Sequence, residues 1–103
     1  MFIETRFYKQ VASSSVETNE CILASNEKIY LTEFGGNAVY SKDVKVEIIW
    51  DTTILLATHG DTVQKTAEEL IGDGIKILKI VLTNDSEQAE TVGGYYMGEK
   101  YIG

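Results

Sequence analysis

The sequence contains no proline, and among its 103 residues it has one cysteine, one histidine and one tryptophan. Because Cys21 is the only cysteine, no disulfide can form within the chain. This fits synthesis in a reducing compartment. Without proline, the ends of strands must be made by Gly, Asn, Asp and Ser.

Basic residues are also scarce: 9 Lys and Arg stand against 16 Asp and Glu, which gives a net charge of −7. They form no cluster, whereas a phosphate-binding groove or a polybasic membrane patch needs one. We therefore expect neither a nucleic-acid nor a membrane partner. No apolar run reaches the length of a signal peptide or a transmembrane segment. We expect the protein to be made in the cytoplasm and to stay there or join an assembled particle.

What the sequence does contain is alternation. In residues 44–50 the apolar side chains Val44, Val46, Ile48 and Trp50 share one face of an extended chain, which predicts a half-buried strand. Residues 2–11, 20–24, 28–34, 53–58, 75–83 and 91–102 form further strand-like runs. Short strands separated by turn signals are typical of an antiparallel β-sandwich. We predict a mainly β, jelly-roll-like sandwich in which residues 1–103 form a single domain, since this length fits one core.

Three turn signals divide these runs. Ser25-Asn26-Glu27 predicts a hairpin between the runs 20–24 and 28–34. Gly35-Gly36-Asn37 predicts the end of that hairpin, because these residues tolerate a positive φ. Asp51-Thr52 predicts a tight connection between two further strands.

Residues 61–72 form the one segment with a helical pattern. Asp61 is a suitable N-cap, Gln64 stands three residues later and Gly72 can end a helix. The apolar residues of the segment, Val63, Ala67, Leu70 and Ile71, keep helical spacing. We predict a short helix here, with a long irregular loop as the alternative.

The strand phases also predict which side chains are buried. The core is expected to contain Ile22, Leu31, Val44, Val46, Ile48, Trp50, Leu55, Ile77, Ile80 and Leu82. In the first strand, Ile3, Thr5 and Phe7 are expected to face one way and Glu4, Arg6 and Tyr8 the other. The apolar phase of residues 75–83 shifts at Ile77-Leu78, which suggests a bulge or burial on both faces.

Few residues suggest catalysis. His59 could act as a general base with Asp61 or Asp73, and Cys21 could pair with it as a thiolate. No nucleophile motif accompanies His59, and Cys21 lies inside a predicted strand. We therefore interpret His59 as a loop residue and Cys21 as a core residue, and we expect no enzyme activity and no cofactor.

Asp61, Asp73 and Asp85, together with Asn84, lie in three turns that could converge on a calcium ion. The spaced aspartates of a calcium-binding loop are missing, and turn formation alone explains these residues. We predict no metal site.

The C-terminal run contains three tyrosines, Tyr95, Tyr96 and Tyr101, beside Gly93, Gly94 and Gly98. Aromatic residues on exposed backbone are common in binding sites and subunit contacts. We predict these three tyrosines as binding residues, supported by the unpaired backbone of a terminal strand. The alternative is that residues 91–102 form only the rim of the core.

Two functions follow. We expect a non-enzymatic structural or interaction module that forms a homo-oligomer or docks on a larger assembly, for example a bacteriophage virion accessory or decoration protein. That example comes from fold analogy alone. The alternative is a small-ligand or carbohydrate-binding β-sandwich in which Trp50 and the three tyrosines stack on sugars.

Overall fold

The computed structural model describes residues 1–37 and 42–103, and this part of the chain contains eight strands and no helix. The strands are β1 (Phe2–Val11), β2 (Ser15–Ile22), β3 (Glu27–Asn37), β4 (Val44–Trp50), β5 (Thr53–Thr58), β6 (Thr62–Ile71), β7 (Ile77–Asn84) and β8 (Glu90–Ile102). The first strand has the bounds predicted from its alternation, and its two faces are as predicted.

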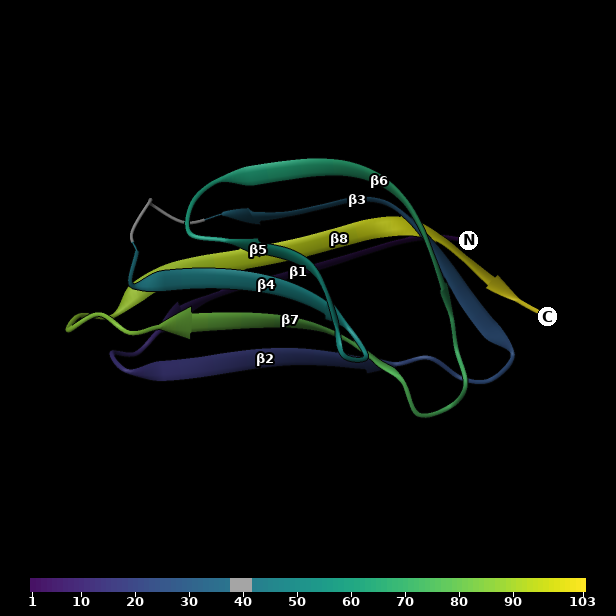
Figure 1. Ribbon diagram of the computed structural model, residues 1–103, viewed down its shortest axis with the longest axis horizontal. Coiled ribbons are helices and arrows are strands. Elements are labelled where there is room, and N and C mark those ends of the chain that lie inside the picture. Colours follow the sequence, from purple (N-terminus) through teal and green to yellow (C-terminus); the bar gives the residue numbers. More distant parts are fainter. Residues whose placement is uncertain (38–41) are drawn as a thin grey trace.

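The strands form two four-stranded antiparallel sheets that pack as a sandwich (Figure 1). One sheet has the order β1-β8-β3-β6 and the other has the order β2-β7-β4-β5. Among strands consecutive in the chain, only β4 and β5 are neighbours in a sheet, and every other connection crosses between the sheets. This is the strand order of a jelly roll, so the predicted sandwich is confirmed. The predicted hairpin over residues 20–34 is wrong, because β2 and β3 belong to different sheets.

The predicted helix over residues 61–72 is also wrong. Residues 62–71 form β6, which pairs with β3 from Gly36↔Thr62 to Lys28↔Ile71. As an edge strand, β6 leaves most of its side chains exposed on both sides of the sheet. Its sequence therefore needs no strict alternation, and helical spacing can arise without a helix.

The core lies between the sheets. Six residues named from the sequence are buried there: Leu31, Val44, Val46, Ile48, Ile80 and Leu82. Trp50 and Leu55 are partly buried and pack against this core. Cys21 does the same, as predicted, from the inner side of β2.

Two core predictions are wrong, because Ile22 and Ile77 face outward. Ile22 is 58% exposed, since the pairing of Cys21 with buried Leu78 turns the next residue of β2 away from the core. Burial alternates without interruption along β7, and its ladders to both neighbours are regular. The apolar shift at Ile77-Leu78 therefore reflects partial cover on the outer face of an inner strand, not a bulge.

Glycines allow the two sheets to approach closely at one place. Gly35-Gly36, predicted as a turn, lies within β3, where Gly36 pairs with Gly94 of β8. A Cβ at Gly94 would lie 2.7 Å from Cγ2 of Ile80, and one at Gly36 would lie 2.9 Å from Cγ2 of Thr58. These glycines leave room for side chains from the facing sheet. The tight turn predicted at Asp51-Thr52 does occur, with Asp51 at a φ of 55°.

Polar contacts close the side of the sandwich where edge strands β1 and β2 meet. Glu17 of β2 lies on the inner side, opposite Leu82, and forms an ion pair with Lys9 of β1 at 2.6 Å. At one end of this side, the buried Asn84 amide donates hydrogen bonds to the carbonyl oxygens of Val11 and Gln88. An inward-facing charge on an edge strand opposes edge-to-edge pairing with another chain.

Candidate functional site

The structure separates the three tyrosines predicted as binding residues. Tyr95 and Tyr101 lie on the outer side of the β1-β8-β3-β6 sheet, whereas Tyr96 faces the core and is only 1% exposed. Alternation along β8 sends Tyr96 to the opposite side from Tyr95. Tyr96 is therefore a core residue, and its placement corrects the prediction that all three share a binding surface.

The position of β8 also differs from the prediction. This strand lies inside its sheet, paired with β1 on one side and with β3 on the other. Its backbone groups are therefore used by its neighbours, and no free strand edge exists there. Any contact made by residues 91–102 must come from their side chains.

The outer side of this sheet gathers most of the tyrosines of the chain, and we call it the tyrosine face. Four of the six tyrosines lie on it: Tyr8, Tyr30, Tyr95 and Tyr101. Phe2 lies on the same face, since it flanks Glu99 on one side and Tyr30 flanks it on the other. Apart from Tyr95, these aromatic side chains are between 40% and 59% exposed.

Two of these rings cover glycine backbone. A Cβ at Gly93 would overlap the Tyr8 ring, and one at Gly35 would lie 2.6 Å from Cε1 of Tyr95. The rings therefore lie directly over the sheet where side chains are missing. Aromatic cover of strand glycines is a known stabilising arrangement. It explains why β3 and β8 each contain a glycine on this face.

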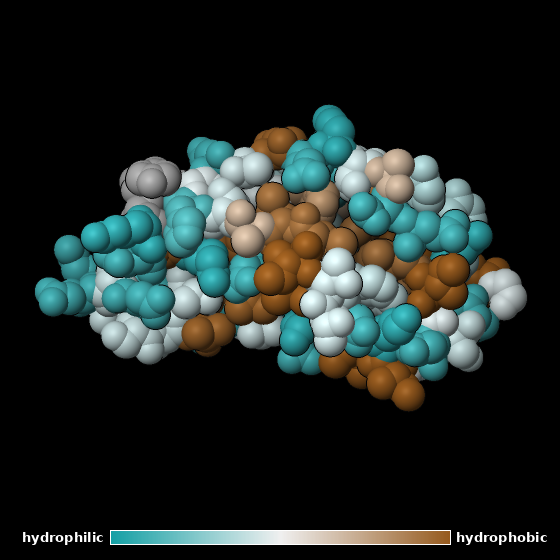
Figure 2. All heavy atoms as spheres, viewed as in Figure 1, coloured by the Kyte–Doolittle hydropathy of each residue, from teal (hydrophilic) through white to brown (hydrophobic). Residues whose placement is uncertain are grey.

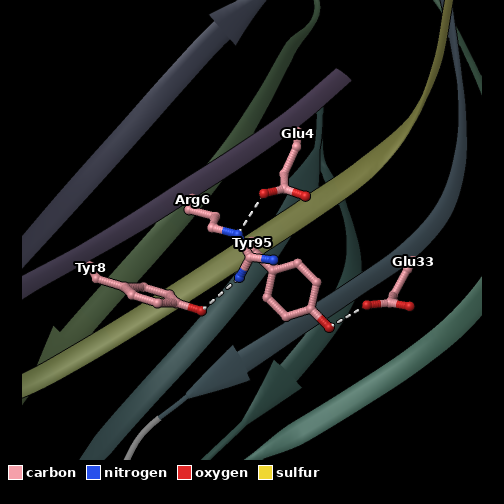
Figure 3. Close-up of polar contacts among 5 residues, drawn as sticks. All are labelled: Glu4, Arg6, Tyr8, Glu33 and Tyr95. Carbon is pink, nitrogen blue, oxygen red and sulfur yellow. Dashed lines mark hydrogen bonds and ion pairs between the residues drawn. The ribbon is translucent and has the colours of Figure 1, made fainter. Parts of the chain in front are cut away.

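A polar network surrounds Tyr95 (Figure 3). The Tyr95 hydroxyl donates a hydrogen bond of 2.7 Å to Oε2 of Glu33, and Glu33 also forms an ion pair with Lys65. The Arg6 guanidinium lies 4.9 Å from the centre of the Tyr95 ring.

Arg6 also has two polar partners on its own strand. Its Nε donates to Glu4 at 2.6 Å and its Nη1 donates to the Tyr8 hydroxyl at 3.4 Å. Counting the contacts of Tyr95, the network joins β1, β8, β3 and β6.

The network shifts the protonation of its members. Burial raises the pKa of Tyr95 to about 12, and the hydrogen bond to the Glu33 carboxylate contributes in the same direction. Lys65 and then the Tyr95 hydroxyl lower the pKa of Glu33. At neutral pH Tyr95 is thus a neutral donor and Glu33 is a charged acceptor. Burial also raises the pKa of Tyr96 in the core.

Two shallow hollows are each lined by two tyrosines of this face. One, of about 340 Å³, is lined by Lys28, Tyr30, Glu69 and Tyr101. The other, of about 210 Å³, is lined by Tyr8, Gly36, Asn37, Asp61, Thr62, Val63 and Tyr95. The second hollow is smaller than the 300–1,000 Å³ usual for small-molecule sites, and the first is near the lower limit of that range.

The residues with catalytic potential do not form a site. His59 Nδ1 is 2.8 Å from the carbonyl oxygen of Val44, so the ring donates a structural hydrogen bond there. Val44 pairs with Asn84 of β7, whereas Cys21 pairs with Leu78 of the same strand. Six residues of β7 correspond to about 20 Å. His59 and Cys21 therefore cannot act as a catalytic pair.

The aspartates considered for calcium do not converge either. Asp61 and Asp73 stand at opposite ends of β6, which spans about 33 Å for its ten residues. The Asp73 carboxylate accepts hydrogen bonds from the backbone N–H groups of Ile75 and Lys76, which lowers its pKa. Over residues 1–37 and 42–103, no three metal-binding side chains form a group. Nor does this part of the chain contain a helix long and apolar enough to cross a membrane.

Comparison with known proteins gives little to add. No protein-family model matches the chain, and no curated protein matches it. Among solved structures, it is similar to part of dimeric latent PorU from Porphyromonas gingivalis, with a TM-score of 0.41 and 5% sequence identity. The match covers 98% of this chain but only 13% of that one.

Proposed function

We propose that this chain is a non-enzymatic interaction module that docks on a protein partner in a larger assembly through the tyrosine face. The observation that supports this most is the gathering of four of six tyrosines, with Arg6, on one outer face. Tyrosine and arginine are enriched among the residues that dominate the free energy of protein–protein binding.

Preorganisation of the face supports the same proposal. Tyr8 and Tyr95 are held over Gly93 and Gly35, and Tyr95 is held further by Glu33 and Arg6. Side chains that are already ordered lose little conformational entropy on binding. Tyr101 and Tyr30 then supply exposed aromatic area at the other end of the face.

A more specific form of the proposal is an accessory or decoration protein of a bacteriophage particle. Its support is analogy: jelly rolls recur in viral capsid proteins, and they also occur in lectins and other proteins. The same analogy therefore serves the alternative function.

Site-specific photo-cross-linking tests the protein-docking proposal. A benzophenone amino acid replaces Tyr101 in one variant and Glu87, in the exposed β7–β8 connection, in a matched control. After irradiation in an extract of the cells that make the protein, we expect one defined protein to be trapped at position 101 and not at 87. An excess of the parent protein, which carries no benzophenone, should compete for the partner and reduce the trapping. The double variant Tyr8→Ser/Tyr101→Ser should not compete. Equal trapping at both positions, or none at 101, contradicts the proposal.

The second candidate function is binding of a carbohydrate at the hollow beside Tyr8. One observation favours it: the Tyr8 ring lies over Gly93, is 44% exposed and has Asn37 beside it in the same hollow. A flat ring next to amide groups suits a sugar. Trp50 and Tyr96, both proposed from the sequence as stacking residues, pack against or within the core and are excluded from this role. A glycan array probed with the parent and with Tyr8→Ser distinguishes this function from protein docking.

A further inference from the structure

The outer side of the β2-β7-β4-β5 sheet carries aliphatic side chains where the tyrosine face carries aromatic ones, and we call it the aliphatic face. The side chains of Ile22, Ile49, Ile54, Ile77 and Val81 lie on it. Ile22 and Ile54 are more than half exposed, at 58% and 57%. Figure 2 shows a hydrophobic patch across the middle of this side of the molecule, over β4, β5 and β7. None of the five named side chains is aromatic.

Four charged residues surround these aliphatic side chains, and their charges cancel. Glu20 and Glu47 are negative, and Lys45 and Lys79 are positive. The chain as a whole carries a net charge of −7. All five aspartates lie in connections between strands: Asp43, Asp51, Asp61, Asp73 and Asp85. Two copies that meet on the aliphatic face therefore do not bring this acidic excess together.

The register of the sheet fixes the positions of the four charges around Val81. Lys79 lies two residues along β7, about 7 Å away, and Glu47 lies directly across on β4, about 5 Å away. Glu20 and Lys45 stand on opposite sides of Val81, each at about 8 Å. The arrangement is therefore self-complementary. Turning the line from Glu20 to Lys45 end for end about Val81 puts the negative Glu20 where the positive Lys45 was.

We propose that a second copy of this chain packs on the aliphatic face about a two-fold axis through Val81. The axis lies in the plane of the face, at right angles to the line from Glu20 to Lys45. It places Glu20 over Lys45 of the second copy. With ideal strand spacings, it also places Lys79 within about 3 Å of the position over Glu47 of the second copy. An isologous contact of this kind satisfies both charge pairs twice.

Two features of the geometry suit such a contact. The strands of the two copies cross at about 70°, which is close to the orthogonal mode of sheet packing. Edge-to-edge pairing beside β2 is opposed by the inward-facing Glu17, so that edge does not compete with a contact through the face. The two tyrosine faces then point away from each other, so that the dimer is bivalent for the partner proposed above.

The size of the face limits the area that a dimer can bury. The four strands have six to eight residues each. At ideal spacings they cover roughly 19 by 24 Å, so a dimer buries about 900 Å² in total. Stable interfaces bury about 1,200–2,000 Å². We therefore expect a reversible dimer whose population depends on protein concentration.

Charge reversal tests this arrangement by sedimentation equilibrium over a range of concentrations. In a dimer of Lys79→Glu, the new glutamate of each copy faces Glu47 of the other copy. In a dimer of Glu47→Lys, the new lysine of each copy faces Lys79 of the other copy. Each variant alone therefore has like charges at both of these contacts. We expect each to dimerise at least about tenfold more weakly than the parent. In an equimolar mixture both contacts again join opposite charges, and the heterodimer should recover to near the parent affinity.

Two controls separate this outcome from other effects. Lys76→Glu changes the net charge as Lys79→Glu does, but lies in the β6–β7 connection and should dimerise like the parent. Thermal unfolding checks that Glu47→Lys, which loses its 3.4 Å ion pair with Lys45, remains folded. A parent that stays monomeric up to about 1 mM, single variants that dimerise normally, or a mixture that does not recover would each overturn the proposal. None of these outcomes affects the cross-linking test of the tyrosine face.

Discussion

The two outer faces of the sandwich differ in how the sheet beneath them is used. On the tyrosine face, Tyr8 and Tyr95 lie over Gly93 and Gly35, so that rings cover bare backbone. On the aliphatic face, every position around Val81 carries a side chain of its own, and no glycine occurs in β2, β4, β5 or β7. Both sheets bury their inner sides in the same core, but their outer sides form two surfaces with different chemistry.

The polar contacts of the two faces also differ in whether they connect different strands. The polar network of the tyrosine face joins four strands through Arg6, Tyr95, Glu33 and Lys65. The ion pair between Lys45 and Glu47 on the aliphatic face lies within one strand. The first arrangement fixes the directions of side chains, as recognition of a different molecule requires. The second leaves a simple pattern of charges that a two-fold axis can match.

The largest expected effect concerns Tyr96, the tyrosine of β8 that faces the core. Replacing Tyr96 with Ala should lower the free energy of unfolding by about 3–5 kcal/mol, because a large buried side chain leaves a cavity. The matched change Tyr101→Ala should cost less than about 1 kcal/mol, since that ring is half exposed. Urea unfolding of both variants measures the difference. Similar losses would mean that β8 has the opposite phase in solution.

A smaller effect on the free energy of unfolding should distinguish the two sides of β8 at its consecutive glycines, Gly93 and Gly94. Gly94→Ala places a methyl group against Ile80 and Val46 of the facing sheet, and overpacking of this kind costs about 1–3 kcal/mol. The atoms nearest to a methyl group in Gly93→Ala all belong to the Tyr8 ring, which can turn away into solvent. We expect Gly93→Ala to be the less destabilising variant and to weaken partner binding instead. Urea unfolding and the cross-linking assay together measure both effects.

Strands with one buried face could be predicted from the sequence. Val44, Val46 and Ile48 show the period of two that burial on one side imposes, and each is buried as predicted. The same reasoning failed for β6, because an edge strand exposed on both sides has no such constraint. Pairing with β3 determines its conformation, and the local sequence contains no signal for that pairing.

The glycines and the crossing connections show a second limit. Gly35-Gly36 indicated a turn, but among the described glycines only Gly74 has a positive φ. Gly35, Gly36, Gly93 and Gly94 lie within strands and provide space for Tyr95, Tyr8 and the facing sheet, which depends on contacts between distant segments. A short connection such as Ser25–Glu27 likewise does not reveal whether it joins neighbours or crosses between sheets.

Part of the candidate site could be predicted and part could not. Tyr95 and Tyr101 were found because tyrosine is frequent in the C-terminal run. Tyr8 and Arg6 lie about ninety residues away and join them only through the β1–β8 ladder. Alternation in residues 2–11 places Arg6 and Tyr8 on the same side of the first strand, and this is the signal that the sequence offers.

Acid should weaken the tyrosine face through Glu33. Because the folded-state pKa of Glu33 is lowered, its carboxylate stabilises the fold above the unfolded value of about 4.3. That contribution is lost as the pH falls through the lowered folded-state pKa. Glu33→Gln removes this titration, so the parent should be the more stable protein at pH 7 and the difference should shrink below about pH 4. Urea unfolding at several pH values measures it, and a difference that is constant with pH contradicts the prediction.

The smallest expected effect is on the aliphatic face. Ile22 is outside the core, so Ile22→Ser should change the free energy of unfolding by less than about 0.5 kcal/mol at concentrations where the monomer prevails. The matched change Ile80→Ser, on the inner side of the same sheet, leaves a cavity and an unsatisfied hydroxyl, and should cost several times more. If Ile22→Ser proves as costly as Ile80→Ser, β2 presents its other side to the core. The aliphatic face would then lose Ile22, and Glu20 would no longer stand opposite Lys45 across Val81.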